Sequence, residues 1–283
     1  MPQFGVILRQ ASFLALVEYH KSILPSQKTR LPRLTPNWST TLTVFAFICS
    51  QTLALPFPFL LFPPIVTFMR KSLSAALRGY PWGHQAICFA PLAAMPAALA
   101  LSIGSGDDLT RYFIALRAEM PSLTKGMEFL TDWLIYALYA VYVFFILNAL
   151  IAGNRSEIRR GLIFILAQVL CTVILVQFIK IAIGKPRPLV ALGGAEFAPW
   201  VLNKDYHSFP SGHTAESAGA ASVLAVRFRR PALSLFLGLI ITLVAFSRIY
   251  LAKHHLSDIV GGACAGLAAS LLNFHLCSEI RHD

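Results

Sequence analysis

Three short motifs in the second half of the chain hold most of the residues that could carry out chemistry. They are KIAIGKPRP at 180–188, PSGH at 210–213 and SRIYLAKHHLSD at 247–258. Together they supply several cations, a sequence typical of a helix start, and histidines close to a carboxylate. These are the groups that bind a phosphate and transfer it.

The cations and the helix start indicate an anion site. Lys180, Arg187 and Arg248 each lie where an apolar block ends, a position at which charge is costly and usually marks function. Arginine suits the paired oxygens of a phosphate. Ser211 can cap a helix, and the N–H groups from Gly212 onward, with the helix dipole, favour an anion. We therefore expect these five residues to form a phosphate cradle.

The histidines predict phosphoryl transfer. His254 and Asp258 are four residues apart, so the carboxylate could hold one ring nitrogen while the other attacks phosphorus. His213, across the cradle, could protonate the leaving oxygen and later activate water to hydrolyse a phosphohistidine. His255 adjoins His254 and is the alternative nucleophile. The spacing to both Arg248 and Asp258 favours His254.

Other polar residues near these motifs carry weaker predictions. Lys185 adds charge beside the cradle and is a possible contact for a substrate headgroup. Asp107 and Asp108 have no partners at metal-ligand spacing, so we expect neither a metal nor another cofactor. The net charge of +11 does not indicate nucleic acid, because most Lys and Arg residues fall in short clusters between apolar blocks.

The elements that must position these motifs are membrane helices. Of the 283 residues, 56% are hydrophobic and 13% charged, whereas a soluble domain carries about 25% charged residues. Spanning the bilayer takes roughly 20 apolar residues. We expect an all-α, polytopic membrane helix bundle with a core of six spans, at about 86–104, 131–152, 162–183, 211–228, 232–252 and 257–277.

The basic clusters predict the orientation of this bundle. They precede the first span, join the second to the third and the fourth to the fifth, and follow the sixth, so alternation puts all four on one side. The positive-inside rule assigns that side to the cytoplasm and the three motifs to the opposite, periplasmic side. The segment 105–130 reads as one or two amphipathic helices at the outer interface.

The N-terminal part of the chain combines basic residues with an apolar block. Residues 1–80 read as a basic cytoplasmic or interfacial segment that contains an apolar block at 41–69, and 81–283 as the six-helix domain. Four prolines break the second half of 41–69. A re-entrant hairpin would keep both ends of the block inside, whereas a single crossing would put the basic N-terminus outside. The hairpin is slightly favoured.

The spaced motifs resemble the signature of the type 2 phosphatidic acid phosphatase superfamily. Lys-x6-Arg-Pro, Pro-Ser-Gly-His and Ser-Arg-x5-His-x3-Asp occur here in the family's order, without a departure at the diagnostic positions. The resemblance runs from about Asp107 to Asn273. It implies a six-helix membrane phosphatase that needs no metal. It also implies phosphate-binding roles for Lys180, Arg187, Ser211, Gly212 and Arg248.

For the catalytic groups, the resemblance implies that His213 is the acid, His254 the nucleophile and Asp258 its orienting partner. Bacterial members of this kind act on phosphorylated lipids: phosphatidic acid, phosphatidylglycerophosphate, undecaprenyl diphosphate or the phosphates of lipid A. We therefore expect a metal-independent lipid phosphate phosphatase of the bacterial inner membrane, with its site facing the periplasm. A lipid phosphotransferase and a non-catalytic lipid-binding protein are the alternatives. The sequence does not select the lipid.

Overall fold

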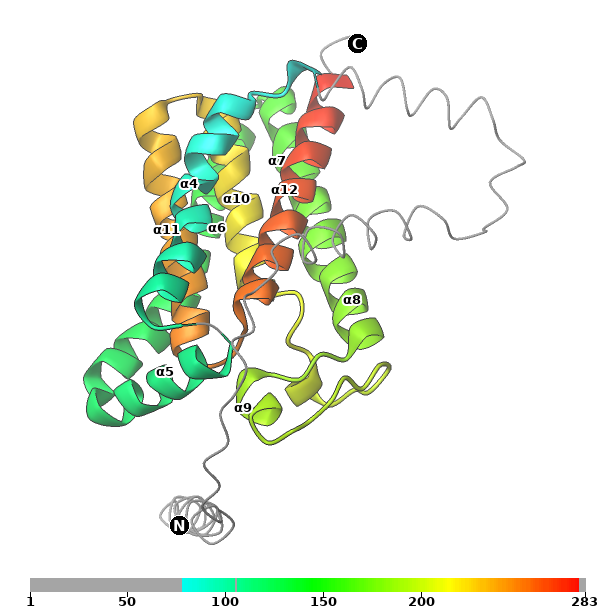
Figure 1. Cartoon of the computed structure of the whole chain (residues 1–283). Helices are drawn as coiled ribbons and strands as arrows, with labels where there is room; N and C mark the ends of the chain where they lie inside the picture. The colour runs from blue at the N-terminus through cyan, green and yellow to red at the C-terminus, as the bar shows by residue number, and fades with distance from the viewer. Residues whose placement is uncertain (1–77, 105, 280–283) are drawn as a thin grey trace, which may run out of the picture. The chain divides into compact units, whose positions relative to one another are not determined.

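The computed structural model describes residues 78–104 and 106–279, and these are helical or in loops, with no β-strand among them. The helices of the described chain are labelled in chain order from α4 to α12 (Figure 1). Their bounds are α4 (Trp82–Ser102), α5 (Asp107–Glu119), α6 (Pro121–Ile151), α7 (Arg155–Gln168), the π-helix η2 (Val169–Ile174), α8 (Leu175–Ile183), α9 (Pro188–Ala191), the 3₁₀-helix η3 (Lys204–Tyr206), α10 (Gly212–Phe228), α11 (Pro231–Tyr250) and α12 (Leu256–Glu279).

Helix α10 is the centre of the bundle. It packs against α4, α6, α11 and α12, and almost all of its length is buried (Figure 1). Small residues allow the close approach: a Cβ added to Gly266 of α12 would lie 2.6 Å from the backbone nitrogen of Gly219. The abundance of Ala, Gly and Ser in α10 therefore reflects helix–helix packing, as in membrane bundles generally.

Five helical segments of the described chain are long and apolar enough to cross a membrane, which makes the protein a polytopic helical bundle. They are Trp82–Ser102, Pro121–Ile151, Arg155–Ala191, Pro231–Tyr250 and Leu256–Ser278. The expected span at 211–228 is not among them. Helix α10 has only 17 residues, about 25 Å of helix, and its small side chains contact protein instead of lipid. Its sequence therefore lacks the hydropathy of a lipid-facing span.

The segment 105–130 differs in part from its prediction. An amphipathic helix, α5, does form over Asp107–Glu119. However, residues 121–130 are continuous with the next span, in one 31-residue helix, α6. The physical reason lies at Pro121, which occupies the first turn of α6, where its missing N–H costs nothing, so the helix begins there and no later residue interrupts it. Residues 1–77, which hold nearly all of the expected N-terminal unit 1–80 and its apolar block at 41–69, lie outside the described residues.

Candidate active site

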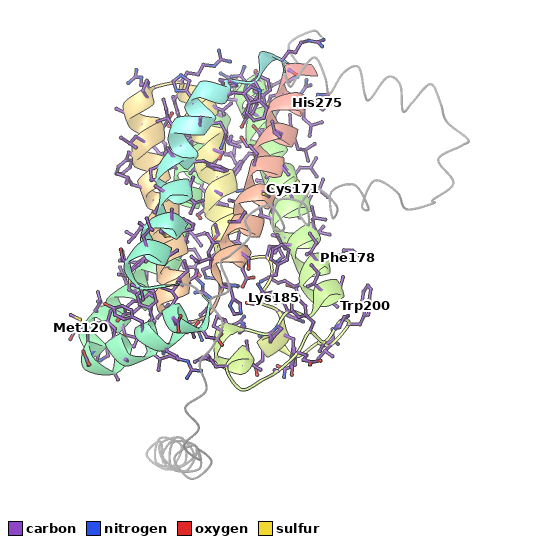
Figure 2. The ribbon with its side chains drawn as sticks, in the orientation of Figure 1. Met120, Cys171, Phe178, Lys185, Trp200 and His275 are labelled. Atoms are coloured by element: carbon purple, nitrogen blue, oxygen red, sulfur yellow. The ribbon has the colours of Figure 1, made fainter. Side chains whose placement is uncertain are left out.

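The three motifs meet at one end of the bundle, where α8 and α11 end and α10 and α12 begin. The backbone N–H of Ser211 donates to the carbonyl of Asp258 at 2.9 Å, which joins the second motif to the third. The N–H of Ser208 donates to the carbonyl of Lys185 at 3.0 Å, which joins the first motif to the segment just before PSGH. Figure 2 labels Lys185 at this end and His275 at the other.

The start of α10 has the features of an anion site. Ser211 is fully buried and is the N-cap, its hydroxyl oxygen accepting from the N–H of Thr214 at 3.4 Å and from the Thr214 hydroxyl at 3.0 Å. A Cβ added to Gly212 would lie 3.4 Å from Nζ of Lys180. The ammonium group therefore lies over the first turn of α10, beside the exposed N–H groups of the helix.

Gly184 turns the chain so that both cations of the first motif reach this place. It ends α8 in the left-handed conformation, with φ of +58°, which glycine adopts without steric cost. An added Cβ would also lie 1.9 Å from the carbonyl oxygen of Ala198, so no other residue fits. Lys180 stays in the last turn of α8, while Arg187 returns on the following loop.

The two arginines hold buried donors that lack partners. Lys180 lies within electrostatic range of both Arg187 and Arg248. The Nε atoms of both arginines are buried without a hydrogen bond in the described part of the chain. An unpaired buried donor costs free energy, so three mutually repelling cations with spare donors are suited to an anionic ligand.

The imidazole of His254 is buried, fixed in orientation and uncharged, as a nucleophilic histidine must be. Its side chain is 3% exposed, and Nδ1 lies 2.7 Å from the carbonyl oxygen of Ser208. A carbonyl only accepts, so Nδ1 carries the proton and Nε2 keeps its lone pair. Burial lowers the pKa of His254 to about 4, against the opposing effect of the nearby Asp258 carboxylate. The ring is therefore uncharged at neutral pH.

Asp258 does not make the direct bond to the ring that its spacing suggested. Its Oδ2 lies 3.7 Å from Nδ1 of His254. The buried carboxylate instead accepts from the Ser208 hydroxyl at 2.5 Å, from the His255 N–H at 2.8 Å and from Nζ of Lys185 at 2.7 Å. Asp258 thus fixes the segments around the imidazole, and Lys185, expected at a headgroup, is its counterion.

His213 lies in the first turn of α10 and faces a residue that the motifs did not predict. Its Nε2 is 3.1 Å from Oδ1 of Asp132 on α6. The preceding residue of α6, Thr131, accepts a hydrogen bond from Arg248 at 3.4 Å. Two consecutive residues of α6 therefore support groups from two different motifs.

The three motifs lie in a part of the chain that matches a known family model. Residues 160–281 match the family model described as the PAP2 superfamily. The chain carries a PAP2 superfamily domain. A solved structure, described as that of the first transmembrane PAP2 type phosphatidylglycerolphosphate phosphatase from Bacillus subtilis, is 22% identical, with a TM-score of 0.38, over 68% of this chain and 96% of that one. A search of curated proteins finds no match. The family predicted from the three motifs is confirmed.

All three motifs fall inside the PAP2 domain, whereas Thr131 and Asp132 precede it. The sequence offered one signal for Asp132: a carboxylate at the start of an otherwise apolar block, which is costly unless it serves a purpose. Nothing in the spacing linked that carboxylate to His213, 81 residues later. Only the packing of α6 beside α10 brings them together.

His255 does not share the environment of His254. Its Nε2 lies 3.2 Å from the carbonyl oxygen of Pro186, and burial, followed by the charge of Lys185, lowers its pKa. The ring therefore joins the first motif of the PAP2 domain to the third. Among residues 78–104 and 106–279, no group of three His, Cys, Asp or Glu side chains is arranged to hold a metal ion.

Proposed function

We propose that this protein is a metal-independent phosphatase that removes a phosphate from a membrane lipid through a phosphohistidine intermediate. The observation that carries the proposal is His254: a buried, neutral imidazole whose Nδ1 is held by a carbonyl, next to the start of α10. Membership of the PAP2 superfamily supports the same reaction class.

Binding of the substrate phosphate uses the start of α10 and the three cations. The N–H groups that follow Ser211 point out of the helix end, and Lys180 lies over them. The spare donors of Arg187 and Arg248 supply hydrogen bonds to the remaining oxygens. These positive groups offset the charge that spreads over the equatorial oxygens in the transition state, a task that metal ions perform in other phosphoryl transferases.

The chemical step begins when the lone pair on Nε2 of His254 attacks phosphorus and the bond to the lipid oxygen breaks. The proton of His213 passes to that oxygen, which leaves as an alcohol or, from a diphosphate, as a phosphate. Burial and the charge of Arg248 lower the pKa of His213 to about 4, whereas the carboxylate of Asp132 favours the protonated form that this step needs. Water, deprotonated by His213, then attacks the phosphohistidine and releases inorganic phosphate.

A lipid substrate follows from where the site lies. The motifs are at the ends of membrane-spanning segments, so a headgroup could reach the cradle while the tail stays among lipids. Phosphatidic acid, phosphatidylglycerophosphate, undecaprenyl diphosphate and lipid A phosphates all present such a group. The arginine clusters around Arg155 and Arg227 lie at the opposite end, which supports a bacterial inner-membrane protein with its site at the periplasmic face.

The experiment is a phosphate-release assay with the purified full-length protein over these lipids, with and without chelator. We expect release from at least one lipid, unaffected by chelator, and loss of nearly all release in His254→Ala. Wild-type protein quenched in alkali should carry one phosphoryl group that acid removes. Recovery of the phosphate on a second lipid would indicate a phosphotransferase. Full activity in His254→Ala would contradict the mechanism.

A further inference from the structure

A cavity of about 450 Å³ lies at the end of the bundle away from the three motifs. It is formed by α6, α7, the last turn of α10 and the end of α12, near His275 in Figure 2. Its volume falls in the range of small-molecule sites. None of the residues placed in the candidate active site lines it, so it is a separate feature of the fold.

The charged groups of this cavity are unbalanced. Three arginines and one carboxylate line it: Arg160, Arg227, Arg229 and Glu157. Glu157 pairs with Arg160 and, through Oε2, with Nη2 of Arg227 at 2.6 Å. Arg229 is exposed and takes part in no ion pair within the described residues. Two positive charges are thus in excess at one mouth of the cavity, which is complementary to an anion.

The remaining wall is apolar and aromatic. Phe145, Phe164 and Phe274 line it, and the guanidinium of Arg227 lies 5.1 Å from the ring centre of Phe145. A free anion gains nothing from such a wall, because apolar surface stabilises only apolar atoms. An amphiphile with an anionic head and a hydrocarbon tail matches both parts. In a bilayer, basic pockets between helix ends bind the headgroups of anionic lipids.

We propose that this cavity binds an anionic phospholipid of the leaflet opposite the candidate active site. The headgroup phosphate lies between Arg229 and the Arg160–Glu157–Arg227 group, and the start of an acyl chain lies against the aromatic wall. The assigned role is binding alone: no histidine is among the described residues that line the cavity, and its one carboxylate, Glu157, is paired with two arginines. Because the cavity shares no residue with the three motifs, this assignment does not depend on the proposed phosphatase activity.

The chain provides matched variants for a test. Arg229 and Arg160 line the cavity, whereas their neighbours Arg230 and Arg159 are exposed and do not. Each Arg→Gln change removes one charge from the same surface. Binding of phosphatidylglycerol to the full-length protein in neutral detergent would be followed by native mass spectrometry, with phosphatidylcholine and inorganic phosphate as comparison ligands.

We expect Arg229→Gln and Arg160→Gln to weaken phosphatidylglycerol binding by about tenfold, and Arg230→Gln and Arg159→Gln to leave it within about twofold. A photoactivatable phosphatidylglycerol should label α7 or α12 near the cavity. If all four variants lose phosphatidylglycerol affinity equally, the binding depends only on the charge of the surface, and the proposal is overturned. Equal binding of phosphatidylcholine, competition by inorganic phosphate alone, or labelling elsewhere would overturn it as well. The melting temperature of each variant without lipid verifies folding.

Discussion

Nε2 of His213 lies 3.1 Å from Oδ1 of Asp132, and this contact joins the first turn of the central helix α10 to α6. A carboxylate at this distance stabilises the protonated imidazole, which is the form that donates a proton to a leaving group. Asp132 is therefore a positioning residue for the proposed acid. It belongs to a helix that carries none of the three sequence motifs.

Replacing Asp132 by Asn should lower kcat by about fivefold. The pair is partly exposed, with 34% of the His213 side chain and 54% of the Asp132 side chain accessible, so the lost attraction is at most about 1 kcal/mol. The alkaline limb of the kcat–pH profile should also move to lower pH, because His213 would lose its proton more easily. Glu119→Gln, at the exposed end of α5, is the control. An unchanged profile in Asp132→Asn would remove the carboxylate from the mechanism.

The pKa of His254 sets a second prediction. Burial lowers this pKa from 6.5 to about 4, so the ring of the free enzyme is already deprotonated at pH 5 and above. Because the neutral ring is the nucleophile, kcat/KM should lose its acid-side activity only near pH 4, and not near the ordinary histidine value. The profile of kcat/KM reports groups of the free enzyme, so it is the measurement to use. An acid limb centred near pH 6.5 that belongs to His254 would contradict the buried environment.

Lys185 offers a test between two roles. The sequence suggested a headgroup contact, whereas its Nζ lies 2.7 Å from Oδ1 of the fully buried Asp258. If it is a counterion, Lys185→Met leaves a buried carboxylate unpaired and should reduce the free energy of unfolding by about 3 kcal/mol. The double variant Lys185→Met/Asp258→Asn should recover part of that loss. A headgroup contact would instead raise KM and leave the stability unchanged. Denaturant or thermal unfolding in detergent measures the difference.

The convergence of the three motifs could be predicted because each lies at the end of an apolar block, and alternating spans put those ends on one side. The partners around them could not. Ser208 holds His254 with a backbone carbonyl, which every residue type possesses, and Asp132 reaches His213 only through the packing of α6. Helix α10 forms at Gly212–Phe228, close to the expected 211–228, and its small residues are buried against other helices, so its low hydropathy reflects its surroundings in the bundle.

Substitution of Arg187 should reduce activity without reducing the stability of the fold. The Nε of Arg187 is buried without a partner in the described structure, and the cost of burying the guanidinium opposes its attraction to the Asp205 and Asp258 carboxylates, so the folded protein gains little from it without a ligand. Arg187→Met should reduce kcat by roughly 100-fold, the usual cost of removing one preorganised donor from a transition state. The unfolding midpoint should stay the same or rise, as occurs when groups kept for function are removed. A large fall in the midpoint, with kcat intact, would mean that Arg187 serves the fold and not the phosphate.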